Sequence, residues 1–572
     1  MLLPLPVLVL IFSLLSTRHL SSLPGAPGLS PRPTRGAGAL RLRADPRDYG
    51  SERENALYCP VGGCIAGKSS VSSGTGPAAV AKSKDDKALG DYYQRLGSVL
   101  AGRQVCLDIF ICHPAPPSVP SSTGPSPGPS SSAFTNFLDL GTLGTLTHMT
   151  AGRLHYFPGP VASPTSPAAA ASLPSSLTPT FLTALRNALA SPLAQEAVMK
   201  IRSSVGLSLK HYVAPGIIHP SEELELAALD PSQSFVAEFL HDGEKIKEGS
   251  RVYLQLALLY TQGGTGQRMV RVHNLQLPTA SAVSGVFRYA DMEAIYATLV
   301  KQAVWQAWSE PLVRVREQLT RACVDMLYQY RQLCAASSPP GQLILPESLK
   351  LLPLYALALL KSDALRVNPP EAGRAHGLPD PTADVRAATL HAFLSAPAKH
   401  LVHMTYPRLY EVVGVGGGRD DTAGSMGLLR LNGCSAESLI DDGVFLLDAW
   451  NQTYLYVGRD VGTRVWTGLF NRPGPPENAH EAGCTLALAV ETSDMAGRVL
   501  ELLEELCDGD RSGYGVGKGV VPAMQVVVAG SGSPSEAHFI KMLVDDRQKN
   551  EQSYVEYLCL VHKQIQNRLA GR

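Results

Sequence analysis

A short segment near the N-terminus matches the pattern of a phosphate-binding loop. Residues 62–69 read GGCIAGKS, which fits G-x-x-x-x-G-K-S, where backbone N–H groups and the lysine surround a nucleotide phosphate. Such a loop needs a strand that leads into it and a helix that leaves it. Pro60 interrupts the apolar run before the loop, and residues 69–76, SSVSSGTG, are a poor start for a helix. A nucleotide-binding enzyme is therefore the weakest function that we consider.

The same segment holds two cysteines that could supply half of a zinc site. Cys59 and Cys64 have no second Cys/His pair at ligand spacing. His480-Glu481 has no second histidine in register for a zinc-binding helix, and the G-x-S-x-G match at residues 124–128, GPSPG, lies in a Pro/Ser-rich stretch and so forms no nucleophile elbow. We therefore expect no catalytic residues, no cofactor and no metal.

Two arginines are the candidates for a binding site. Arg268 and Arg271 lie in the second of two β-prone runs, residues 251–261 and 267–277, which are joined by the glycine-rich loop QGGTG. This arrangement predicts a hairpin, because glycine supplies the positive φ angles of the turn. Three residues apart on one strand, the two arginines should point to opposite faces. They are either ordinary strand-edge charges or a cationic contact for acidic peptide signals or lipid headgroups.

The hairpin must be positioned by the elements around it, and the hydrophobic pattern divides these into classes. The region before residue 278 is rich in β pattern, with Phe235, Ala237 and Phe239 at alternate positions. The region after it is helical, with an apolar stripe over residues 312–330. The other elements that we expect are helices at 88–101, 348–361, 383–395 and 493–506, strands at 105–111, 410–415, 428–431, 444–448, 454–457 and 523–529, and a long final helix.

The composition limits the class of protein. At roughly 150 residues per domain, 572 residues imply several domains. Lys+Arg and Asp+Glu are both 50, so no bulk attraction to nucleic acid is expected. Ten cysteines spread over the chain form no dense framework, which fits a reducing compartment. No uninterrupted apolar run reaches ~18 residues, which excludes a multi-span membrane protein.

Three segments have compositions that do not favour a packed core. Residues 16–85 are rich in Gly, Pro, Ser and Arg, and residues 113–132 and 159–178 are rich in Pro and Ser. Such segments bury too little apolar surface to offset the entropy of ordering the chain. We expect them to be flexible.

The apolar run at the N-terminus has three interpretations. Residues 2–15, LLPLPVLVLIFSLL, have the length of a signal-peptide core, which would favour secretion or organelle targeting. The run could also result from a wrongly assigned gene start. A structural role as a strand is the third interpretation, because Pro4 and Pro6 disfavour a regular helix.

Several longer strings closely resemble the Sec-twenty-four (Sec24) family, the cargo-adaptor subunit of the COPII vesicle coat. The most specific are AVMKIRSSVGL at 197–207, ALLYTQGGTGQRMVRVHNLQLP at 257–278 and GQLILPESLKLLPLYALALLKSDAL at 341–365. Strings at 139–159, 406–410, 442–448 and 542–556 match in the same order. The resemblance runs from about residue 88 to the C-terminus. The string at 349–365 resembles the adaptor rather than its sister subunit, Sec-twenty-three (Sec23), so we assign no GTPase activation.

The resemblance implies a multidomain α+β fold. We expect a flexible leader with the signal-like run (1–85), a partial von Willebrand A-like trunk with the Pro/Ser insertion (86–199), a β-sandwich (200–282), an all-helical domain (283–398), a gelsolin-like α/β domain (399–530) and a C-terminal helix (531–572). The family's zinc ribbon and the first part of its trunk have no counterpart here, which weakens the expectation of a heterodimer with the sister subunit.

The resemblance also implies a function. We expect a non-catalytic COPII coat component that binds cytosolic sorting signals of membrane cargo, associates peripherally with the endoplasmic reticulum membrane and coated vesicles, and binds no nucleic acid. A secreted or organellar paralogue of the same scaffold is the alternative.

Overall fold

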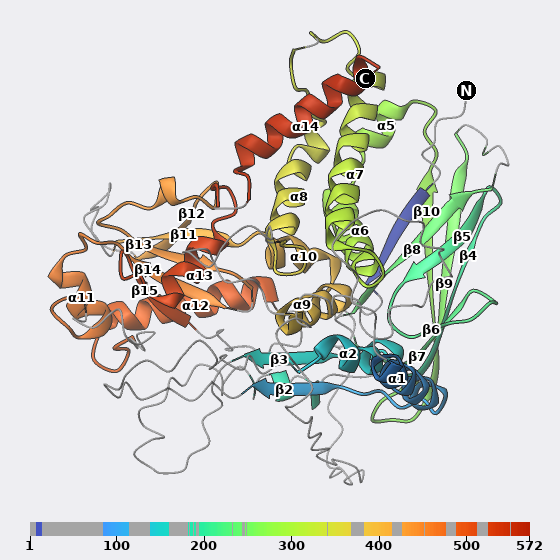
Figure 1. The fold of residues 1–572 in the computed structure, drawn as a ribbon, viewed down its shortest axis with the longest axis horizontal. Coiled ribbons are helices and arrows are strands. Elements are labelled where there is room, and N and C mark those ends of the chain that lie inside the picture. Colours follow the sequence, from blue (N-terminus) through green and yellow to red (C-terminus); the bar gives the residue numbers. More distant parts are fainter. Residues whose placement is uncertain are drawn as a thin grey trace, which may run out of the picture.

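The computed structural model describes residues 7–13, 84–113, 138–158, 194–230, 233–242, 249–339, 341–367, 383–414, 426–450, 452–475, 488–511, 524–548 and 551–571, with a few single residues between 181 and 246. The phosphate-loop pattern, Cys59, Cys64, His480 and the two Pro/Ser tracts beyond residue 113 lie outside these ranges. A β-sandwich, a layer of helices and a second sheet with its own helices follow one another across the molecule, and a small α/β unit lies along one side (Figure 1). Among the described residues, no helix combines the length and apolar character needed to cross a bilayer.

The β-sandwich consists of a five-stranded sheet in the order β10-β9-β4-β7-β6 and a three-stranded sheet in the order β1-β8-β5. The strands are β1 (Val7–Ser13), β4 (Ala194–Ser203), β5 (Leu207–Val213), β6 (Ile217–Ile218), β7 (Glu223–Leu229), β8 (Ser234–His241), β9 (Arg251–Gln262) and β10 (Arg268–Pro278). Phe235 and Phe239 fill the space between the sheets, as their alternation predicts. Val236, on the opposite face of β8, packs in the core of the helices. Strand β8 therefore joins two domains.

The N-terminal apolar run contributes a strand to this sandwich. Strand β1 pairs antiparallel with β8 from Val7↔Leu240 to Ser13↔Ser234. Of the three interpretations of the run, the structure agrees with the third, a structural role as a strand. It lies inside the segment that we predicted as a flexible leader over residues 1–85.

Strand β4 crosses the predicted boundary between trunk and sandwich at residues 199 and 200. It begins at Ala194, and its pairing with β9 shifts register between Gln195 and Val198. Glu196 there has a φ of 51°. Such a bulge interrupts the alternation of inward and outward side chains, so the pattern hides the start of the strand.

The helical layer comprises α5 (Val283–Arg288), α6 (Met292–Ala307), α7 (Leu312–Leu333), η3 (Glu347–Leu349), α8 (Leu352–Lys361), α9 (Ala383–Ser395), α10 (Ala398–Thr405) and α14 (Tyr554–Leu569). The predicted stripe lies in α7, where Val315, Leu319 and Leu327 are buried. The single helix predicted over 348–361 is wrong. It is split into η3 and α8, because Pro353 stands in the first turn of α8 and lacks an N–H for a continuous helix.

The second sheet has the strand order β12-β11-β13-β14-β15. Its strands are β11 (Arg408–Val413), β12 (Gly427–Arg430), β13 (Val444–Asp448), β14 (Thr453–Val457) and β15 (Met524–Val528), and its helices are α11 (Thr463–Phe470), α12 (Asp494–Arg511) and α13 (Pro534–Met542), with the short η4 (Ala436–Ser438). Helices α11 and α12 pack on one face of the sheet. Helix α13 packs on the other face through Phe539. The segment 531–572, predicted as one helix, therefore holds two helices that belong to different cores.

The small α/β unit contains α1 (Lys84–Gly102), α2 (Leu140–Met149) and the parallel strands β2 (Ile109–His113) and β3 (Leu154–Pro158). The carboxylate of Asp384, on α9, accepts hydrogen bonds from the backbone N–H groups of Leu138 and Leu140 at 2.7 and 2.9 Å. The Leu140 N–H is one of the first donors of α2, which have no partner within the helix, and an acidic group is favourable at this end. This contact fixes the unit on the helical layer. The von Willebrand A-like character of the unit stays a prediction.

A buried lysine holds the end of α9. Lys301 of α6 has no exposed surface, and its Nζ donates to the carbonyl oxygens of Phe393, Leu394 and Ala396 at 3.3, 2.5 and 2.9 Å. Ser234 of the sandwich donates to the same Ala396 oxygen at 2.8 Å. The last carbonyls of a helix have no partner within it, so these donors replace the missing ones. Burial lowers the pKa of Lys301 to about 7.

A second group of cations joins the helical layer to the segment that precedes α14. Arg316 donates to the Leu360 and Leu365 carbonyls at 2.5 and 2.9 Å and to Glu551 Oε2 at 2.9 Å. Lys361 Nζ donates to the carbonyls of Val544 and Asp546 at 2.6 and 2.7 Å. Tyr557, Val561 and Ile565 of α14 then pack in the helical core. The helix that follows the second sheet in sequence thus returns to the earlier domain.

Replacement of Lys301 by Met should make the free energy of unfolding less dependent on pH. The folded pKa of about 7 lies below the ordinary 10.5, so between pH 7 and 10 the unfolded chain binds more protons. Stability therefore rises with pH in this window, by up to about 1.4 kcal/mol per unit. Urea unfolding at pH 7 to 9.5 should show a smaller slope for Lys301→Met, and lower stability of ~1–3 kcal/mol from the unpaired carbonyls. An unchanged slope would contradict the prediction, and Lys350→Met, at an exposed position, is the control.

Replacement of Gly144 by Ala should destabilise the contact between α2 and α9. A Cβ at Gly144 would lie 1.9 Å from His391 Nε2. The His391 ring is itself buried and packs against Trp308 at 4.5 Å between ring centres, so it has little room to move. We expect a loss of ~1–3 kcal/mol in urea unfolding. Gly497→Ala is the matched control, because nothing lies within 4 Å of its Cβ, and alanine favours α12.

Candidate functional site

The two candidate arginines lie on the predicted hairpin, which the structure confirms. Strands β9 and β10 pair antiparallel from Arg268↔Thr261 to Pro278↔Arg251. Gly264 and Gly266 have φ angles of 85° and 66°, a region that glycine enters without strain. Gln262 N donates to Gln267 O at 2.8 Å and closes the loop. Strand β10 forms one end of its sheet, so the hairpin is the sandwich's edge on that side.

The register places the two arginines on opposite faces, as their spacing predicts. Arg271 is opposite Leu258, whose side chain is in the sandwich core, while Arg268 is opposite Thr261 on the outer face. Arg268 is held in place there. Its Nη1 donates to Thr261 Oγ1 and to the Glu196 carbonyl, both at 2.9 Å, and lies 3.5 Å from Glu196 Oε2.

Arg271 differs from Arg268 in having a guanidinium that is not engaged. In the part of the chain that the structure describes, no hydrogen bond or ion pair holds its side chain, which is half-buried. His273 follows on the same face, and burial, with the charge of Arg271 as a smaller cause, lowers its pKa. Near neutral pH His273 therefore adds no charge, and Arg271 is the cation that can bind an acid here.

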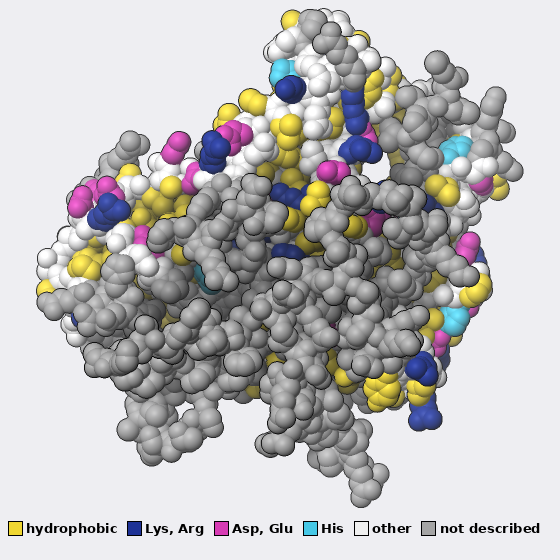
Figure 2. Space-filling model, viewed as in Figure 1, with side chains coloured by type: hydrophobic (Ala, Val, Ile, Leu, Met, Phe, Trp, Pro, Cys, Tyr) yellow, Lys and Arg dark blue, Asp and Glu magenta, His cyan; other side chains and the backbone are white. Residues whose placement is uncertain are grey.

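Exposed apolar side chains accompany these charges. Val270 and Val272 of β10 are 66% and 49% exposed, and Leu259 and Tyr253 of β9 lie on the same outer face. Elsewhere, basic and acidic side chains of the described residues are interspersed on the face seen in Figure 2. The hairpin thus combines an apolar outer face with one available cation.

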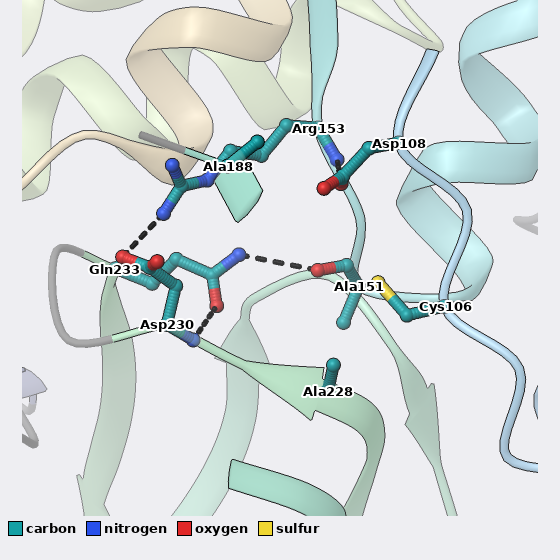
Figure 3. Close-up of a pocket in the computed structure, with 8 residues that line it drawn as sticks. All are labelled: Cys106, Asp108, Ala151, Arg153, Ala188, Ala228, Asp230 and Gln233. Atoms are coloured by element: carbon teal, nitrogen blue, oxygen red, sulfur yellow. Dashed lines mark hydrogen bonds and ion pairs between the residues drawn. The ribbon is translucent and has the colours of Figure 1, made fainter. Parts of the chain in front are cut away.

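A cleft between the small α/β unit and the sandwich is the other site that we considered (Figure 3). Arg153 and Asp230 form an ion pair across it. Asp108 Oδ1 accepts from the Arg153 backbone N–H at 2.7 Å, and Gln233 Nε2 donates to Ala151 O at 3.1 Å. The remaining residues of its lining are Cys106, Ala188 and Ala228.

The chemistry of this cleft favours a joint rather than a binding site. Its arginine and its Asp230 are paired with each other, so neither charge is available to a ligand. Burial raises the pKa of the Cys106 thiol to about 12, which keeps it protonated and unreactive near neutral pH. Sequence patterns gave no signal for this joint, because its partners come from segments far apart in the chain. Within the described ranges, no three His, Cys, Asp or Glu side chains assemble in the arrangement of a metal site.

Comparison with known proteins identifies the two central domains. Residues 194–280 match the Sec23/Sec24 beta-sandwich domain, and residues 291–403 match the Sec23/Sec24 helical domain. The candidate hairpin lies inside the first of these ranges.

Curated relatives extend the likeness over most of the chain. The protein transport protein SEC24 B of Arabidopsis thaliana is 28% identical over 504 residues, which cover 88% of this chain and 40% of the relative. Human Sec24C is 30% identical over 391 residues, 68% of this chain and 33% of the relative. The chain spans about 40% of the length of the first relatives, and less of others.

A solved structure shows the same fold. The crystal structure of the human COPII-coat protein Sec24c superimposes with a TM-score of 0.68 at 24% identity and covers 84% of this chain and 56% of that chain. The multidomain α+β fold that the resemblance implied is confirmed. The chain is therefore a homologue of the Sec24 protein transport proteins, and it carries the beta-sandwich and helical domains of the Sec23/Sec24 family.

Proposed function

We propose that this chain is a non-catalytic component of the COPII coat, which selects cargo for transport from the endoplasmic reticulum to the Golgi by binding cytosolic sorting signals. The observation that carries the proposal is the succession of Sec23/Sec24 beta-sandwich and helical domains within a chain that is similar to Sec24 proteins over most of its length. Its partners in this role are the Sec23 sister subunit and the tails of membrane cargo, and it works at the membrane surface.

The candidate hairpin supports a role in peptide binding. An acidic signal needs a cation that is not already paired, and Arg271 meets this requirement better than Arg268, which is bound to Glu196 and Thr261. The secreted or organellar alternative depended on the N-terminal apolar run, and Val7–Ser13 of that run form strand β1. For this reason we retain the coat component.

The proposal is tested by recruitment of the full chain to liposomes that display an acidic cytosolic cargo tail, with and without the Sec23 sister subunit. We expect the tail and the sister subunit each to increase the bound fraction. A chain that binds neither is not a coat adaptor.

Replacement of Arg271 by Ala should weaken binding of the acidic tail about ten-fold or more, because a charge-assisted contact is worth roughly 1.5–3 kcal/mol. Binding of an apolar tail should be spared, and binding of the acidic tail should weaken with salt. Arg268→Ala is the matched control on the same strand, with a smaller effect expected. Equal losses for both tails in Arg271→Ala would indicate damage to the hairpin, and no loss for either would remove Arg271 from the site.

A further inference from the structure

The backbone of β10 offers one unused hydrogen-bonding edge. Gln267 bonds to Gln262, and Thr279 N donates to Ser250 O at 3.2 Å, so the odd-numbered residues between them bond to β9. In an antiparallel pair, alternate residues turn their N–H and C=O groups away from the partner. Those of Val270, Val272 and Asn274 therefore point outward. No other strand among the described residues pairs with β10.

The middle of this edge has little protection against further pairing. Natural edge strands are commonly blunted by prolines, inward charges or bulges, or are very short. In β10, which has 11 residues, the proline is the final residue, Pro278, the pairing with β9 is regular throughout, and the one inward charge in the middle is Arg271. The exposed Val270 and Val272 lie in the middle, where their outward backbone groups and their apolar side chains are available together.

The side chain between these valines adds a charge requirement. A strand that pairs with β10 would place one residue opposite Arg271, on the face away from the valines. Since Arg271 has no acidic partner among the described residues and His273 is neutral near pH 7, one carboxylate complements this face. A second copy of the chain fits less well, because antiparallel β10–β10 pairing would bring two Arg271 side chains to one face.

We propose that the free edge of β10 binds an extended, strand-forming peptide of a partner protein with the pattern apolar–acidic–apolar. The two apolar residues pair with Val270 and Val272, and the acidic residue between them contacts Arg271. Main-chain hydrogen bonds to the edge supply affinity, and the alternating side chains supply specificity. This inference rests on the proposed function only in taking the peptide to be a cargo signal.

The test measures fluorescence anisotropy of a short labelled peptide with a central Val-Glu-Val, titrated with the full chain. We expect the dissociation constant of the Val-Glu-Val peptide to be at least about ten-fold lower than that of a Val-Lys-Val peptide, because lysine cannot make the charge-assisted contact with Arg271. The variant Arg271→Glu should reverse this preference. In this variant the Lys peptide gains a charge pair and the Glu peptide loses one. A misfolded hairpin would weaken both peptides, so it cannot produce the reversal.

Two N-methylated peptides test the added strand without changing the protein. N-methylation of both valines removes N–H groups that face β10 and should abolish binding. N-methylation of the central Glu removes an N–H that faces away and should leave binding within about two-fold. On the protein side, Val272→Pro removes an outward N–H that the peptide would use and should weaken binding about ten-fold or more. The hairpin should still form, because β9 does not use this N–H.

Equal effects of the two methylation patterns would overturn the inference, and so would the absence of a reversal in Arg271→Glu. Concentration-dependent self-association of the chain that the peptide does not disrupt would also overturn it, because it would assign the edge to a second copy. The assay contains no membrane and no sister subunit. Its failure therefore leaves the liposome result standing, and failure of recruitment leaves peptide pairing at β10 standing.

Discussion

The bonds of Lys301 to the end of α9 are the interaction on which the arrangement of domains depends. Helix α9 contacts α2 and β3 of the small α/β unit, β8 of the sandwich, and α6 of its own layer. Its two ends are fixed differently. Asp384 near its start satisfies the donors of α2, and Lys301 with Ser234 satisfies the acceptors at its end. A buried carbonyl without a hydrogen-bond partner lowers the free energy of unfolding by roughly 1–3 kcal/mol. The hydrogen bonds at its two ends therefore help to fix the position of α9, together with its packing.

The same logic operates where the second sheet meets the helices. Arg316 binds the backbone carbonyl of Leu360, and Lys361 binds that of Val544, much later in the chain. Arg316 also forms an ion pair with Glu551. Apart from the contact of Arg316 with Glu551, these cations bind main-chain oxygens, which are present whatever the side chains of those residues are. Such joints tolerate sequence change around them while the geometry of the backbone is kept.

Local patterns predicted the hairpin and the strands of the second sheet well, since glycine at 264 and 266 and alternating apolar residues act over a few neighbours. Where one residue disturbs the period, the prediction was wrong or incomplete. The bulge at Glu196 hid the start of β4, and Pro353 divided a helix. Helix α13 was missed as a separate element because its place depends on the contact of Phe539 with Tyr454 on one face of the sheet.

The candidate site shows the same limit. A two-residue period was sufficient to place Arg268 and Arg271 on opposite faces. Which of them is available depends on Glu196, 72 residues earlier in the chain, and no local pattern contains that information. Lys301 likewise meets its partners across 92 to 95 residues.

The return of α14 to the helical layer has a consequence for the order of synthesis. The sheet β12-β11-β13-β14-β15 is inserted between α10 and α14, two pieces of one core. On the ribosome, the earlier helices are therefore synthesised well before α14, which covers them. Their apolar faces stay uncovered while the whole inserted domain is translated. During that interval the inserted domain can fold as a unit, whereas the helical layer exposes the surface that Tyr557, Val561 and Ile565 later bury. Chaperones that hold exposed apolar helices would act on this protein at that stage.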